Sequence, residues 1–205
     1  MKAPRHPAGS SDGSLMKSSM SLPARLTVLA AKTIGGASLL AFVVFVLNGP
    51  VPLIQLASST ASALLLDGLL CIGFFVQHSG MVRRSFQDRI ARFVPQPFIP
   101  AIYAIASGLA LGVLLVAWQP TGLVIASAGG PFRWAVRSLA VVAVVVFVAG
   151  VRALRHFDPF GVRPIEAMSS GRQPRQVPLT IRGPYRWVRH PLYTAMLLLI
   201  WSHPE

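Results

Sequence analysis

The chain has 205 residues, of which 53% are hydrophobic and only 12% are charged. Soluble domains average about 25% charged residues and disordered chains are poor in apolar ones, so both classes are excluded and a membrane protein is indicated. The formal net charge of +13 also suggests nucleic acid as a partner. The single cysteine, Cys71, excludes an intramolecular disulfide or a multi-cysteine metal site.

The apolar residues fall into discrete segments. Residues 1–24 are basic and rich in Ser, Gly and Pro, which predicts a disordered cytoplasmic tail. Residues 25–205 are predicted to form an all-α integral membrane domain, because backbone polar groups in lipid must bond within their own segment. Four segments approach the ~20 residues that a helix needs to cross a bilayer: 26–47, 53–76, 98–118 and 134–151.

A fifth apolar segment, 192–201, is too short to cross a bilayer. We expect either a re-entrant or interfacial element or an incomplete helix there. The basic residues predict the orientation. With the N-terminus in the cytoplasm, every Lys and Arg except Arg133 and Arg137 falls on the cytoplasmic side. This positive-inside asymmetry accounts for the excess charge, so nucleic acid is not an expected partner.

Two intramembrane features have more than one interpretation. Asp67 lies in the middle of the second segment, where an unpaired ionisable group is costly. It is either a proton relay or, as we favour, a neutral or paired structural acid. Gly108 and Gly112 are spaced for close helix packing, which we expect within the chain rather than at a dimer seam.

Two clusters near the ends of segments contain groups that can do chemistry. His78 follows the second segment and is a candidate general base, a haem or metal ligand, or an ordinary interface residue. In residues 155–163, aromatic rings alternate with charges, and Pro159 and Gly161 interrupt the helix. Asp158 there is expected to pair with a neighbouring arginine, and the cluster is either a helix exit or the wall of a binding pocket.

The densest cluster is Arg182–Tyr193, in which arginines and His190 alternate with aromatic rings. Arginine forks match carboxylates, aromatic faces attract cations, and a helix that starts at Pro191 attracts anions. A ligand with both a carboxylate and a cationic centre fits such a site. The alternative is a basic and aromatic anchor at the membrane surface.

Three motifs together resemble a family of integral-membrane methyltransferases. Residues 183–193, followed by an apolar run to Trp201, are similar to the RHP signature of the isoprenylcysteine carboxyl methyltransferase and phospholipid methyltransferase group. Residues 74–81 and 156–163 are similar to the branch that contains methanethiol S-methyltransferase and the NnrU-type proteins. The resemblance covers about residues 26–205 and is more specific for the superfamily than for the substrate.

The resemblance implies S-adenosylmethionine as cofactor, bound at the cytoplasmic face of what we expect to be the bacterial inner membrane. The implied acceptor is a small apolar thiol, with an isoprenylcysteine carboxylate or a lipid amine as further candidates. No metal ligands are implied. The cofactor-side candidates are Tyr185, Arg186, Arg189, His190 and Tyr193, and the acceptor-side, catalytic candidates are His78, His156 and Asp158.

The family pattern also includes, after the RHP helix, a partner helix with a glutamate pair and a Gly/Tyr-rich tail. The sequence printed here has neither after Glu205. We therefore expect a fragment, a truncated reading frame or a degenerate member. The alternative function is that of an NnrU-type or zeta-carotene-isomerase-like haem-binding or accessory protein, in which His78 would ligate iron. A non-enzymatic scaffold is a third alternative, and no oligomeric state is predicted.

Overall fold

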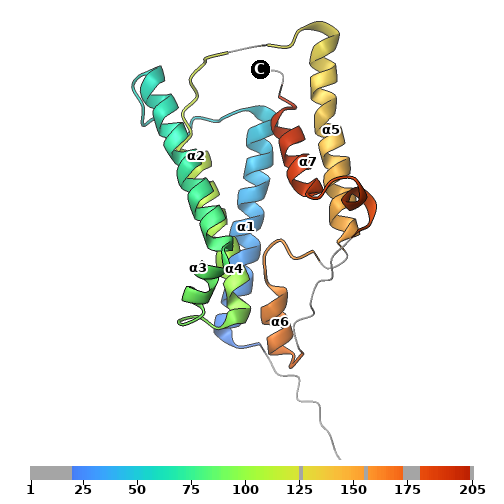
Figure 1. Ribbon diagram of the computed structural model, residues 1–205. Helices are drawn as coiled ribbons and strands as arrows, with labels where there is room; N and C mark the ends of the chain where they lie inside the picture. The colour runs from blue at the N-terminus through green and yellow to red at the C-terminus, as the bar shows by residue number, and fades with distance from the viewer. Residues whose placement is uncertain (1–19, 125–126, 155–156, 173–180, 204–205) are drawn as a thin grey trace, which may run out of the picture.

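The computed structural model describes residues 20–124, 127–154, 157–172 and 181–203 (Figure 1). Within these ranges the fold is all-helical, which confirms the predicted fold class. Four helices there are long and apolar enough to cross a membrane: α1 (Leu22–Asn48), α2 (Thr60–Val82), α4 (Ile99–Ala117), extended at its start by the 3-10 turn η1 (Gln96–Phe98), and α5 (Gly130–Ala153). Shorter elements lie between and after them: α3 (Arg84–Ile90), α6 (Arg163–Ser169), η2 (Gly183–Arg186) and α7 (Pro191–Ile200).

The predicted second segment, 53–76, is displaced from the helix that forms. The chain stays irregular through residues 49–59, and α2 then continues to Val82. The start is set by a capping box, because the Ser59 hydroxyl accepts from the backbone N of Ser62 and the Ser62 hydroxyl accepts from the backbone N of Ser59. His78 consequently lies within the helix and not beyond its end.

Three of the long helices form one packed unit, with α4 between α1 and α2. The approach of α4 to α1 depends on Gly108. A Cβ there would lie 3.1 Å from both Ile34 Cγ2 and Ser38 Oγ, whereas a Cβ at Gly112 would meet nothing within 4 Å. The predicted small-residue contact therefore forms inside the chain at Gly108.

The second unit is the pair α5 and α7, which stands beside α1 in Figure 1. Gly150 allows the start of α7 to approach α5, since a Cβ at this position would lie 2.9 Å from Leu192 Cδ2. Gly183 has a φ of +56° and lies against Ala153, which places η2 on the last turn of α5. Residues 183–193, which we call the RHP segment after Arg189, His190 and Pro191, are thus held against the end of α5.

The short helix α6 covers the start of α1. Ile165 is fully buried in a cluster with Ala24, Ala31 and Ala101. Glu166 of α6 forms an ion pair with Lys32 of α1, with Oε1 and Nζ 3.2 Å apart. A mostly apolar cluster and one partly exposed ion pair therefore attach the segment after α5 to the first helix.

Candidate functional site

The site residues gather toward one end of the molecule, which we call the basic end. It is the end where α1 and α4 start and where α2 and α5 finish, at the bottom of these four helices in Figure 1. The connections there contain most of the described arginines outside α5: Arg83, Arg84, Arg89, Arg92, Arg163, Arg172, Arg182, Arg186 and Arg189.

His78 is held by side chains from two helices. Its ring stacks on Phe74, one turn earlier in α2, with centroids 5.3 Å apart. From α4, the Tyr103 hydroxyl lies 2.9 Å from Nε2 and 3.1 Å from Nδ1, and Ser107 Oγ lies 3.2 Å from Nδ1. Tyr103 and Ser107 share a face of α4 because they are four residues apart. Each ring nitrogen therefore has a hydroxyl within hydrogen-bond distance.

Gln77 extends this cluster. Its Nε2 donates to Met81 Sδ at 3.0 Å and reaches Ser107 Oγ at 3.5 Å. Its Oε1 is buried and has no hydrogen-bond partner within the described ranges. A buried acceptor without a partner is uncommon in folded proteins. The cluster thus retains the capacity to bind one more donor.

Asp158 occupies the turn that leads into α6. Its Oδ2 accepts from the backbone N of Arg163 at 2.8 Å, which ties the carboxylate to the first residue of that helix. Next to it, Gly161 has a φ of +62° and lies so close to Pro100 that a Cβ would fall 2.4 Å from the backbone carbon. Asp158 therefore bonds to the backbone at the start of α6, and His156 lies outside the described residues.

The RHP segment forms η2 and the first turn of α7. Pro191 is fully buried against α5, and the carbonyl of His190 accepts from the backbone N of Thr194 at 3.0 Å. The rings of His190 and Tyr193 lie 5.5 Å apart. Arg186 and Arg189 are exposed. Burial raises the pKa of the Tyr185 phenol, so this group remains a neutral hydrogen-bond donor at physiological pH.

This donor set suits the methyl donor that the sequence implies. Two exposed guanidinium groups can bind a carboxylate, and the phenol rings of Tyr185 and Tyr193 offer faces to a cationic centre. Trp187, 86% exposed, adds a further aromatic face in the same segment. The residues present therefore fit S-adenosylmethionine, which has both a carboxylate and a sulfonium.

Tyr103 stands in the first turns of α4, at the basic end, where the RHP segment also lies on the last turn of α5. Its hydroxyl lies 2.9 Å from Nε2 of His78. The fold therefore brings an acceptor-side candidate and a cofactor-side candidate to the same region, although 115 positions separate residues 78 and 193 in the chain.

Tyr103, Ser107 and Gln77 were not singled out from the sequence. Tyr103 and Ser107 are isolated polar residues in an otherwise apolar segment, four positions apart. That spacing was the available signal, because it places both hydroxyls on one helix face. It could not show which helix they would meet.

Asp67 lies at the opposite end of α2 and is only 6% exposed. Its Oδ1 accepts from the backbone N of Gln119 at 2.9 Å. Gln119 in turn uses both ends of its amide on backbone groups, accepting from Leu56 and Ala57 and donating to Ile54 and Ala117. This contact agrees with the structural interpretation of Asp67.

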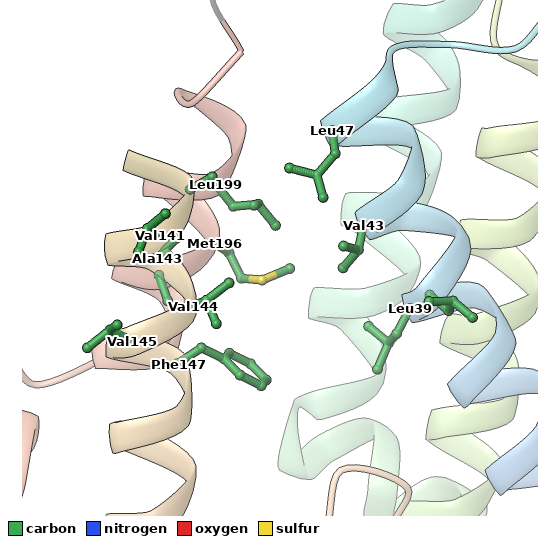
Figure 2. Close-up of a pocket in the computed structure, with 13 residues that line it drawn as sticks. Leu39, Val43, Leu47, Val141, Ala143, Val144, Val145, Phe147, Met196 and Leu199 are labelled. Carbon is green, nitrogen blue, oxygen red and sulfur yellow. The ribbon is translucent and has the colours of Figure 1, made fainter. Parts of the chain in front are cut away.

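An apolar groove of about 590 Å³ separates α1 from the α5 and α7 pair. Figure 2 shows Leu39, Val43 and Leu47 of α1 on one side of the groove and Phe147 of α5 and Met196 of α7 on the other. Its lining runs along α7 from Ala195 to Leu199, directly after the turn that holds Tyr193.

Proteins named methanethiol S-methyltransferase match this chain. The one from Pseudomonas deceptionensis is 34% identical over 154 residues, which are 70% of this chain and 55% of that protein. The chain is thus similar to these methyltransferases over about 70% of its length. The relative from Crocosphaera subtropica is 33% identical over 150 residues (71% of this chain, 58% of that protein), and the one from Mycobacterium tuberculosis is 28% identical over 153 residues (73% and 62%).

The chain spans about half the length of the curated relatives that it matches. No family model matches it, and no solved structure shows significant similarity to it. The relatives' names support a methyltransferase family and give no support to the haem-binding alternative.

Proposed function

We propose that this chain forms the membrane domain of a methyltransferase that moves the methyl group of S-adenosylmethionine to a small apolar thiol. The small thiol is favoured over an isoprenylcysteine carboxylate or a lipid amine because the homologues are named for methanethiol. The observation that carries the proposal is that the contact between His78 and Tyr103 and the RHP segment lie at the same end of the long helices.

The cofactor side of the proposed site is the RHP segment. Arg186 and Arg189 bind the carboxylate, while the aromatic rings of Tyr185 and Tyr193, together with His190, surround the cationic centre. When bound, S-adenosylmethionine supplies an activated methyl group on a positively charged sulfur. The basic end then faces the cytoplasm, in line with the positive-inside rule, and in a bacterium the membrane is the inner one.

The acceptor side is the His78 cluster. A thiol becomes a strong nucleophile only after it loses its proton, and a half-buried imidazole is a suitable base for that step. The groove along α7 gives an apolar acceptor a route from the bilayer toward Tyr193. Methyl transfer is a displacement between two bound groups, so most of the acceleration comes from positioning and exclusion of water. Asp158 and His156 remain proposed members of this side.

Calorimetric titration of S-adenosylmethionine into the detergent-purified chain tests the cofactor side. We expect binding to the wild type and its loss in His190→Ala and in Arg189→Ala. Arg92→Ala, which removes another exposed arginine near the basic end, is the matched control and should bind like the wild type. Wild-type-like binding by His190→Ala would remove that residue from the site.

A further inference from the structure

In the proposed function, on which the following inference rests, a thiol must lose its proton. The geometry of the His78 cluster indicates which group takes that proton. Both ring nitrogens of His78 already lie within hydrogen-bond distance of hydroxyl groups, Nε2 of Tyr103 and Nδ1 of Ser107. Phe74 stacks on the ring. An incoming thiol therefore finds no ring nitrogen without a protein hydroxyl beside it.

The distances and the chemistry of the two hydroxyls indicate which nitrogen carries the proton. A neutral imidazole has one lone pair to accept a hydrogen bond and one N–H to donate. A phenol, with a pKa near 10, is a much stronger donor than a serine hydroxyl. The Tyr103 oxygen lies nearer to Nε2, at 2.9 Å, than to Nδ1, at 3.1 Å. Ser107 Oγ has two lone pairs and can accept from both Nδ1–H and Gln77 Nε2.

These donor strengths and distances favour the Nδ1–H tautomer, in which the Tyr103 hydroxyl donates to Nε2. The lone pairs on the Tyr103 oxygen can then accept a proton from a thiol.

We infer that Tyr103 is a catalytic proton relay, which takes the thiol proton on its hydroxyl oxygen while passing its own proton to Nε2 of His78. The S–H bond and the original O–H bond break, and a new O–H bond and an N–H bond form. The freed sulfur lone pair bonds the methyl carbon, and the old carbon–sulfur bond pair returns to the sulfonium donor. His78 becomes an imidazolium, with Ser107 holding Nδ1–H. Ser107 is thus a positioning residue.

The relay is tested by comparing two acceptors with the full chain. An alkanethiol is protonated at neutral pH, whereas an aromatic thiol of low pKa is already a thiolate. Tyr103→Phe should lower the rate with the alkanethiol by about 100-fold, within the range of general acid–base catalysis, and leave the rate with the aromatic thiolate nearly unchanged. His78→Gln should show the same pattern, and the double variant should be no slower than either, because the two groups act as a unit.

Ser138→Ala removes a hydroxyl from α5, where it bonds only to the backbone carbonyl of Ala135 among the described residues, and is the matched control for both acceptors. Equal losses with both thiols in Tyr103→Phe would overturn the relay, because a residue that only shapes the site slows both reactions. Full activity with the alkanethiol would overturn it as well.

Nitrogen-15 NMR of the imidazoles provides a readout that does not need activity. The His78 signals are assigned by their loss in His78→Gln. We expect Nδ1 to be protonated, Nε2 to be unprotonated, and the Nε2 resonance to move in Tyr103→Phe. A protonated Nε2 in the wild type would overturn the relay. Failure of the wild type to transfer methyl to either thiol would instead contradict the proposed function, and the NMR result would still decide the hydrogen-bonding arrangement.

Discussion

The helix pair α2 and α4 holds a polar cluster at each end, and the two are built differently. At one end, the side chains of Asp67 and Gln119 form hydrogen bonds with backbone groups of residues 54–57 and 117–119. At the other end His78 meets the side chains of Tyr103 and Ser107.

The difference distinguishes a cluster that ties the chain together from one whose side chains can exchange protons. Backbone partners cannot change their protonation, and both Asp67 and Gln119 are almost completely buried, at 6% and 4% exposed. The His78 cluster is half-buried, consists of hydroxyls and an imidazole that can exchange protons, and includes an acceptor on Gln77 with no partner in the described part of the chain. Polar groups inside a membrane domain thus do not all indicate function.

The largest expected effect is on catalysis at the His78 end. His78→Gln should lower the rate of methyl transfer to an alkanethiol by about 10²- to 10⁴-fold, the contribution usual for a general base. The melting temperature should change little, because the ring is only partly buried. The rate is measured from initial velocities and the melting temperature from thermal unfolding, on the same preparation. A large drop in stability would show that this end is also structural.

At the opposite end, Gln119→Leu should lower the free energy of unfolding by about 3 kcal/mol, because it leaves several part-buried backbone groups without partners. Binding of S-adenosylmethionine by the folded fraction should be unchanged. Denaturant or thermal unfolding in detergent provides the measurement. Gln55→Leu, at an exposed position in the same loop, is the matched control and should be close to wild type.

Gly108 lies on α4 between the two clusters, and a side chain there tests the packing that supports both. Gly108→Val should cost about 1–3 kcal/mol of stability through overpacking against Ile34 and Ser38. Gly112→Val, one turn later and facing open space, should stay within about 1 kcal/mol of wild type. Unfolding curves for the pair provide the comparison, and equal losses would contradict the close approach of α1 to α4.

The smallest effect is expected for Asp67→Asn. The amide oxygen can still accept from the backbone N of Gln119, so stability should fall by less than about 1 kcal/mol and methyl transfer should be nearly unchanged. Asp67→Ala, which removes the acceptor, should be the less stable of the two. A large loss of rate in a well-folded Asp67→Asn would make Asp67 a proton-transferring group instead.

The sequence predicted the four long helices but misplaced the start of α2. Residues 51–56 include Val51, Leu53, Ile54 and Leu56, so the loop before the helix is as apolar as the helix itself. Hydropathy alone cannot separate such a loop from a helix. The capping pattern at Ser59 and Ser62 was the local signal that a window of hydropathy averages away.

The sequence predicted the RHP segment and His78 as candidate site residues, but it did not predict the groups that surround His78. Aromatic and basic residues in a short run such as 182–193 are visible as a cluster because they are neighbours in the chain. Tyr103 and Ser107 are 25 and 29 positions from His78 and belong to another apolar helix. Their four-residue spacing places both hydroxyls on one helix face, but nothing local shows which helix that face meets.

Composition and charge by themselves are enough to predict a helical membrane domain, its number of long helices and the end where arginines gather, because these follow from the cost of placing polar groups and charges in lipid. Which side chains meet was decided only by tertiary packing. Gly108, Gly150 and Gly161 let neighbouring segments approach closely. That approach sets the position of α4 against α1, of α7 against α5, and of the turn before α6 against the start of α4.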